Sequence, residues 1–466
     1  MRRRDFIAAT TASAMLVATP LAASVGNGTG GRVVRYALAA RATKQRLGPE
    51  DAPETDLWLV NGVSPGPLIE ARQGDELEIT FTNELDVPTT MHWHGIRNLN
   101  AMDGVPGLTQ PAVEPGETFI YRFPLKDAGT FWYHAHNKGW EQLARGLYGP
   151  LVVHEAEPDS GPRDILLMAD DWRLDDDYQI HEDSLGSLMD WSHQGRLGNW
   201  LTINGASLPD IQVPSGKVRL RLVNAANARS LTFQLGAGAD AEIVALDAAP
   251  CIPFRADGFR IAPAQRVDLI ADLPEGATSL YELSGGQPFE AARLIAAPQA
   301  GEAAAPRPAG PASASWYPRP DIAGARVVDI HMQGGAMGNL TEASLMGEMM
   351  PLRELATDHS KMWAFNGIVG GYENLLADVA RGETVVLRIW NDTRWEHAMH
   401  LHGQHFWVNS REFGRAEHYL LRDTYLMAPA ERADLVFVAD NPGDWLFHCH
   451  MMEHHAAGMG GVIRIA

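Results

Sequence analysis

Residues 448–450 read His-Cys-His, and their types and spacing could bind metal ions on both sides of one strand. Successive side chains of an extended strand point to opposite faces, so His448 and His450 would share one face while Cys449 projects from the other. A thiolate binds a soft-tolerant ion on its side, and each imidazole can bind an ion on the opposite side. The tripeptide therefore offers a short covalent path for an electron between metal sites.

The residues that follow this tripeptide strengthen the prediction of a copper site. His454 and Met459 lie a few positions downstream. A second imidazole and a weak axial thioether are what a blue-copper site built on two histidines and one cysteine requires. Structural zinc sites are closed tetrahedra and need neither a cysteine that bridges two sites nor an axial methionine, so zinc is disfavoured.

Four His-x-His pairs occur in the chain, which is far more than chance placement of 18 histidines in 466 residues would give. Residues two apart on a strand lie on one face, about 6.7 Å apart at their backbones, so neighbouring imidazoles can share ions. The pairs lie near the two ends of the chain, and we expect those two regions to meet around a metal cluster. The pairs are His92 and His94, His134 and His136, His400 and His402, and His448 and His450.

An internal repeat indicates how these pairs are positioned. Three Asn-Gly turns, at Asn61, Asn204 and Asn366, each lead into a glycine turn and an alternating strand. A second repeated segment, built around Pro115, Pro263 and Pro429, is again followed by strand-like alternation. Three copies of one β-rich unit are predicted. Short alternating strands between Gly, Pro and Asn turns favour an all-β protein made of β-sandwiches.

The repeat predicts the domain boundaries. We expect a first domain at 30–157, a second at 158–300 and a third at 322–466. Residues 301–321 are rich in Ala, Pro, Gly and Ser, which is typical of an exposed linker.

The register of the repeat shows which copies carry the chemistry. His92 lies 18 residues after Gly74, and His400 lies 18 residues after Gly382. His134 and His448 likewise share one offset from the proline of the second repeated segment. In the middle copy the corresponding positions hold no histidine, so the second domain is predicted to be a spacer without metal ligands. Those positions are Gln234, Gly236 and Glu282.

The net charge and the N-terminal residues indicate which partners and which cellular compartment to expect. A net charge of −20 argues against nucleic acid or an anionic membrane as partner. Residues 1–24 combine an arginine-rich start, a short apolar run and small residues, and they resemble a twin-arginine export signal. No later apolar run is long enough to span a bilayer. We expect a soluble, exported, periplasmic monomer without membrane insertion.

The two cysteines are not expected to pair. Cys449 lies between two histidines, where a disulfide would remove the strongest metal ligand available. Cys251 is interpreted as a small buried hydrophobic residue.

Four segments together resemble the copper-binding motifs of the multicopper oxidases. They read His-Trp-His-Gly from His92, His-Ala-His from His134, His-Ala-Met-His-Leu-His-Gly from His397, and His-Cys-His-Met-Met-Glu-His-His-Ala-Ala-Gly-Met from His448. The resemblance covers nearly all of the mature chain, in matching order and spacing. It implies three cupredoxin-like Greek-key β-sandwich domains, as in laccases and bacterial copper-efflux oxidases.

The resemblance also implies a ligand set for four copper ions, one of type 1, one of type 2 and two of type 3. The type 1 copper would be held by His397, Cys449 and His454, with Met459 axial. The type 2 copper would be held by His92 and His400. The type 3 pair would be held by His94, His134, His136, His402, His448 and His450.

Three neighbouring residues carry further expectations. Asp103 matches an aspartate that lies near the type 2 copper in the family and supports proton delivery, although an Asp-Gly turn also favours aspartate there. His455 stands where many bacterial relatives have a carboxylate, which leaves the proton donor to oxygen open. His405 and His455 are expected to support the ligands or to lie at the surface.

The predicted function is oxidation of a small reducing substrate coupled to reduction of O₂ to water, with Cys449, His448 and His450 as the electron path. An exported copper-sequestering protein without turnover, or a catalytically silent scaffold, is the alternative. Candidate substrates are phenols and aromatic amines, Cu(I) or Mn(II). Five methionines in a segment expected to be loop-like or helical could bind Cu(I), or could fill gaps in the core. They are Met332, Met337, Met346, Met349 and Met350.

Overall fold

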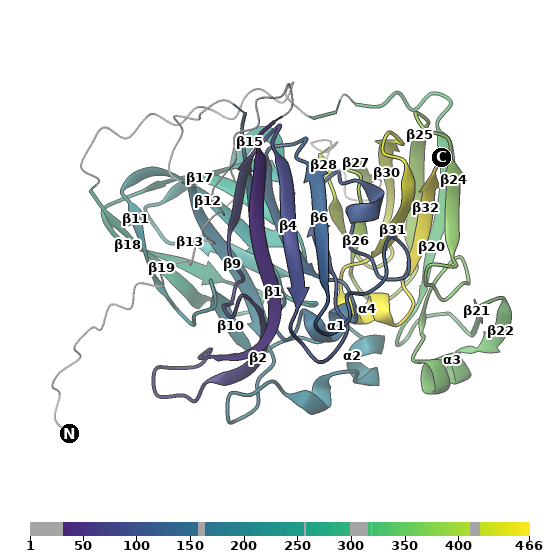
Figure 1. The fold of residues 1–466 in the computed structure, drawn as a ribbon, viewed down its shortest axis with the longest axis horizontal. Helices are drawn as coiled ribbons and strands as arrows, with labels where there is room; N and C mark the ends of the chain where they lie inside the picture. Colours follow the sequence, from purple (N-terminus) through teal and green to yellow (C-terminus); the bar gives the residue numbers. More distant parts are fainter. Residues whose placement is uncertain (1–30, 157–163, 256–257, 299–315, 318, 411–419) are drawn as a thin grey trace.

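The computed structural model describes residues 31–156, 164–255, 258–298, 316–317, 319–410 and 420–466. The expected export signal and most of the expected linker lie outside these residues. Strands dominate and form three β-sandwiches, which confirms the predicted all-β, cupredoxin-like fold class. In the view of Figure 1 the first domain (purple to blue) stands between the second (teal) and the third (green to yellow).

The first domain packs two four-stranded sheets face to face. Their strand orders are β2-β1-β4-β6 and β3-β8-β7-β5. Alternation in β4 puts Leu77, Ile79 and Phe81 into the buried core between the sheets. The elements are β1 (Val33–Gln45), β2 (Thr55–Val60), β3 (Ile69–Arg72), β4 (Glu76–Asn83), β5 (Met91–His94), η1 (Asn100–Met102), β6 (Thr118–Pro124), β7 (Gly129–Ala135), α1 (Gly139–Gln142) and β8 (Tyr148–His154).

The second domain has a six-stranded and a five-stranded sheet. Their orders are β10-β9-β12-β17-β14-β15 and β11-β19-β18-β13-β16. Cys251 on β15 is buried in this core and forms no disulfide, as expected. The elements are β9 (Asp164–Trp172), η2 (Glu182–Ser184), α2 (Leu188–Ser192), β10 (Trp200–Ile203), β11 (Asp210–Pro214), β12 (Gly216–Asn224), β13 (Leu231–Leu235), β14 (Asp240–Leu246), β15 (Ala249–Arg255), β16 (Phe259–Ile261), β17 (Arg266–Leu273), β18 (Gly276–Glu282) and β19 (Phe289–Ala297).

The third domain repeats the sandwich and adds a hairpin. Its sheets run β23-β20-β25-β30-β27-β28 and β24-β32-β31-β26-β29, and β21 pairs with β22. The elements are β20 (Arg326–Gly334), β21 (Glu342–Leu345), β22 (Glu348–Pro351), α3 (Leu352–His359), β23 (Trp363–Phe365), β24 (Leu375–Val379), β25 (Thr384–Asn391), β26 (His397–Leu401), β27 (Phe406–Ser410), β28 (Leu421–Arg422), β29 (Thr424–Met427), β30 (Arg432–Val438), β31 (Gly443–Cys449), α4 (Met452–Ala456) and β32 (Gly460–Ile465).

The methionine segment differs in part from its expectation. Met332 lies on β20 and is fully buried in the core of the third domain, so it belongs to no loop-like or helical insert. Met346 occupies the turn of the β21–β22 hairpin, and Met349 and Met350 lie on β22. Met337, Met346 and Met349 are each more than half exposed. The alternation of β20 places Met332 inward, and this explains the difference.

Candidate metal centre

Strand pairing brings the His-x-His pairs of each outer domain together. In the first domain β5 and β7 are antiparallel neighbours, and His92 lies directly opposite His134. In the third domain β26 and β31 pair in the same way, and His400 lies opposite His448. Directly opposite residues project to the same face of a sheet. Each outer domain therefore presents a patch of imidazoles, at the same place in the fold as the repeat predicts.

Cys449 projects away from these imidazoles, as the period of a strand requires. Its Sγ lies 3.6 Å from His397 Nδ1 and 3.7 Å from His454 Nδ1, and the two Nδ1 atoms are 3.0 Å apart. His397 comes from β26, and the single turn of α4 carries His454 back to the thiol. Thr393 Oγ1 lies 2.9 Å from Nε2 of His397. Two imidazoles and a thiol thus converge on one point.

Burial favours the neutral forms of these three side chains. Burial raises the pKa of the Cys449 thiol to about 12 and lowers that of His454 to about 4. Burial, and then the neighbouring His454, hold the pKa of His397 well below its usual value. The imidazole lone pairs are therefore free to bind a cation, and binding to the thiolate must release a proton.

Eight further imidazoles meet between the first and third domains. The rings of His92 and His402 have centroids 4.0 Å apart, and those of His94 and His400 are 3.8 Å apart. The Nε2 atom of His402 lies 3.0 Å from that of His448. All eight imidazoles are buried. The eight are His92, His94, His134, His136, His400, His402, His448 and His450.

The hydrogen bonds of these imidazoles show which nitrogens face the cluster. His92 and His400 each donate from Nδ1 to a backbone carbonyl at 2.8 Å, and the Nε2 of each has no partner. His94 is reversed, because its Nε2 is hydrogen-bonded and its Nδ1 has no partner. Buried polar groups are rarely left unpaired, so bare nitrogens gathered in one place fit bound cations. The donor set suits copper.

Two aspartates, one from each outer domain, are hydrogen-bonded to imidazoles of the cluster. Asp103 follows η1 of the first domain; its carbonyl oxygen accepts from His92, and its Oδ2 accepts from His402 Nδ1 at 2.8 Å. Asp423 of the third domain mirrors this, since its carbonyl oxygen accepts from His400 and its Oδ1 lies 3.2 Å from His94 Nε2. Each aspartate therefore orients one imidazole of its own domain and one of the other.

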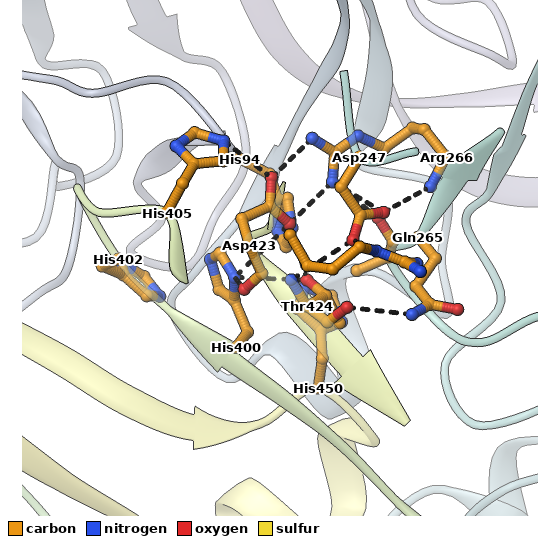
Figure 2. A network of polar contacts seen from close by, with 12 residues as sticks. His94, Asp247, Gln265, Arg266, His400, His402, His405, Asp423, Thr424 and His450 are labelled. Atoms are coloured by element: carbon orange, nitrogen blue, oxygen red, sulfur yellow. Dashed lines mark hydrogen bonds and ion pairs between the residues drawn. The ribbon is translucent and has the colours of Figure 1, made fainter. Parts of the chain in front are cut away.

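Sequence reasoning identified Asp103 but missed Asp423 and its partner Arg266. Figure 2 shows Asp423 between His94, His400 and the guanidinium of Arg266. Burial alone would raise the pKa of Asp423, but Arg266 and then His94 hold it well below the usual range. Arg266 closely follows Pro263, around which the repeated segment of the second domain is built. This position in the repeat is the one sequence signal that could have pointed to Arg266.

The two extra histidines approach the cluster without joining it. The ring of His455 lies 4.3 Å from that of His448 and 5.7 Å from that of His136. His405 Nε2 lies 3.5 Å from an Asp423 oxygen. A cavity of about 730 Å³ is lined by His136 and His455 and extends to Lys361, Tyr372 and Trp140. Small molecules could reach the edge of the cluster through this cavity.

Comparison with known proteins agrees with this architecture. Models of the multicopper oxidase family match residues 41–158, 163–291 and 349–466. Multicopper oxidase MmcO of Mycobacterium tuberculosis is 30% identical over 98% of this chain and 95% of that protein. The crystal structure of a multicopper oxidase from Pseudomonas thermotolerans has a TM-score of 0.80 and 32% identity, covering 94% of this chain and all of that one.

A second solved structure carries a more specific description. A multicopper oxidase from Campylobacter jejuni, described as a metallo-oxidase, has a TM-score of 0.79 and 27% identity over 97% of this chain and 94% of that one. These matches and the fold place the chain in a class of copper oxidoreductases built from cupredoxin domains. The chain belongs to the multicopper oxidase family.

Among the residues that the structure describes, no helix is both long and apolar enough to cross a bilayer.

Proposed function

We propose that this protein oxidises a small reducing substrate one electron at a time and couples this to reduction of O₂ to water. One observation carries the proposal. The thiol of Cys449 lies in the group with His397 and His454, while the flanking His448 and His450 lie in the imidazole cluster. A single tripeptide therefore joins an electron-accepting site to a multi-ion site by covalent bonds.

The proposed ligands are those that the resemblance to the multicopper oxidases implies. His397, Cys449, His454 and Met459 would hold the type 1 copper, and His92 and His400 would hold the type 2 copper. The other six cluster imidazoles would hold the type 3 pair. Four coppers would supply the one-electron steps that reduce O₂ by four electrons to two waters. Unpartnered Nε2 atoms on His92 and His400 support this assignment.

The chain's own groups would orient the ligands and control access. Asp103 fixes His92 and His402, and as a buried carboxyl group beside the cluster it is the proposed support for proton delivery. The cavity beside His136 and His455 is the proposed route for O₂ and water. On the other side, His454 is fully buried and its Nε2 donates to the His193 carbonyl at 2.7 Å. Electrons from a substrate would therefore pass through the backbone around His193 to reach His454 and the type 1 copper.

A copper-sequestering protein without turnover is the second candidate, because it needs the same ligands. Copper content does not separate the two. The deciding measurement is oxygen uptake by the copper-loaded protein with a phenol, with Cu(I) and with Mn(II). Uptake that depends on one of these donors supports the oxidase. A fully copper-loaded, blue protein that consumes no oxygen with any donor would support sequestration.

We further propose export to the periplasm by the twin-arginine-type signal.

The exposed methionines provide the prediction on substrate class. Replacing Met337, Met346 and Met349 with Leu should preserve the fold and phenol oxidation, because the two side chains have similar volume and apolar character. Oxidation of Cu(I) should fall, because thioethers bind Cu(I) and alkyl groups do not. Oxygen consumption by both proteins with each donor measures this.

Met332 is left unchanged in that variant because it is buried in the core. Equal Cu(I) rates in the two proteins would contradict delivery by methionine and leave the oxidase proposal intact. Loss of every activity would instead show that these methionines contribute to folding.

A further inference from the structure

The second domain carries no proposed copper ligand, yet it places one charged side chain beside the cluster. Arg266, the first residue of β17, is fully buried. Its Nη1 and Nη2 donate to Asp423 Oδ1 and Oδ2 of the third domain at 2.8 and 2.6 Å. Its Nε donates to the Thr130 carbonyl of the first domain at 3.0 Å. One guanidinium of the second domain is therefore hydrogen-bonded to both other domains. Figure 2 shows its pairing with Asp423.

Asp247 and Gln265 of the second domain bind the segments that carry the two partners of this ion pair. Asp247 Oδ1 accepts the backbone N–H of Arg266 at 3.0 Å, and its Oδ2 accepts from Arg422 Nε at 2.7 Å. Gln265 Nε2 donates to the Thr424 carbonyl at 2.9 Å. The residues on either side of Asp423 are thus hydrogen-bonded to the second domain.

The ion pair also packs against the first histidine motif. Gly95 directly follows His94 and has φ +84°. A Cβ atom there would lie 2.5 Å from Arg266 Nη2 and 2.5 Å from Asp423 Oδ2. Only glycine permits this approach of backbone to ion pair. The glycine of the His-Trp-His-Gly motif is therefore explained by Arg266 and Asp423.

Asp423 transmits this restraint to the cluster through two contacts. Its carbonyl oxygen accepts from His400 Nδ1, and its Oδ1 lies 3.2 Å from His94 Nε2. Planar, bidentate pairing fixes a carboxylate in both position and rotation, which a single hydrogen bond does not. Partners that hydrogen-bond metal-binding histidines fix the ring and its tautomer.

We propose that Arg266 is a positioning residue of the trinuclear copper centre, which is the proposed type 2 ion together with the type 3 pair. Through the pairing of Arg266 with Asp423, the second domain orients His94 and His400. This inference rests on the proposed function, because it concerns the same cluster. The second domain is then more than a spacer: it supplies no ligand but determines how two ligands face the ions. Asp103, which mirrors Asp423, has no ion pair with an arginine among the described residues, so the restraint acts on one side of the cluster.

The test compares Arg266→Met with Arg221→Met. Arg221 is a matched control: it is buried on the neighbouring strand β12, contacts two aspartates, and donates to Thr130 Oγ1 at 2.8 Å. Both variants lose a contact to the first domain, but only Arg266 contacts Asp423. Three quantities are measured: copper per chain after dialysis against EDTA, the electron paramagnetic resonance spectrum of type 2 copper, and the blue type 1 absorption.

We expect Arg266→Met to retain trinuclear copper with about 10- to 100-fold lower affinity. Its type 2 spectrum should change, while the blue absorption is kept because Cys449, His397 and His454 do not contact Arg266. Arg221→Met should match wild type in both copper readouts. Identical copper retention and type 2 spectra in the two variants would overturn the proposal. A wild-type chain that binds no copper would instead overturn the proposed function.

A second variant covers the case in which Arg266→Met does not fold. Asp423→Asn combined with Arg266→Met removes both charges, and the Asn carbonyl can still accept from His94. Replacing both partners of a buried pair costs less than removing one. We expect this double variant to fold and to keep an altered type 2 spectrum, because the bidentate restraint is gone. A wild-type spectrum in the double variant would also overturn the proposal.

Discussion

Cys449→Ser is expected to abolish the blue colour and the oxidase activity together. The colour arises from charge transfer between a cysteine thiolate and type 1 copper, and serine offers no such donor. The same side chain begins the covalent path to His448 and His450, so electrons would no longer reach the cluster. Visible absorption and oxygen uptake, measured on one copper-loaded preparation, check both losses. A variant that stayed blue would show that the thiolate assignment is wrong.

The chain contains a matched control for this change. Cys251 is the only other cysteine, and it is also buried and unpaired. It lies in the core of the second domain, where burial raises the pKa of its thiol to about 11. Cys251→Ser should therefore keep the colour and the activity. Any loss there should appear as lower stability, because a hydroxyl replaces a buried thiol.

Much of the site could be predicted because its histidines and Cys449 follow the two-residue period of a strand. The two-residue spacing of His448 and His450 shows that they share one face of a strand. The equal offsets from Gly74 and Gly382 show that the histidine pairs occupy equivalent places in the two outer domains. The same spacing predicts that Cys449 faces a different site. The fold class followed from the same alternation, since turns and strands recur three times. Local rules sufficed wherever one strand positions the residues.

The interdomain roles of Asp423 and Arg266 could not be predicted in this way. Asp423 reaches His94 and Arg266 over more than 150 positions of sequence, and no local period relates them. The sequence groups Met332 with four later methionines in one insert, whereas burial on β20 decides its position. Interdomain contacts depend on how finished sandwiches pack, and this information is not present in any one segment.

His134→Ala is expected to deplete the imidazole cluster of copper while leaving the type 1 site loaded. His134 Nε2 lies 3.3 Å from His450 Nε2, so the two rings would share one ion between the first and third domains. Removing a ligand from such a shared site leaves the partner imidazole without its ion. Copper per chain should fall below that of wild type, and oxygen reduction should be lost. The blue absorption should persist, because Cys449 and its two histidines are untouched.

Glu282→Ala is the matched control, because Glu282 occupies the same register position in the second domain. Its Oε1 accepts the backbone N–H groups of Thr232 and Ser284, at 3.1 and 2.8 Å. Its loss leaves two donors unpaired and should cost about 1–3 kcal/mol of stability. Copper per folded chain should nevertheless equal that of wild type, and the same holds for Gln234→Ala. Loss of an ion in either control would mean that the second domain supplies a ligand. Equal copper in His134→Ala and wild type would instead remove His134 from the ligand set.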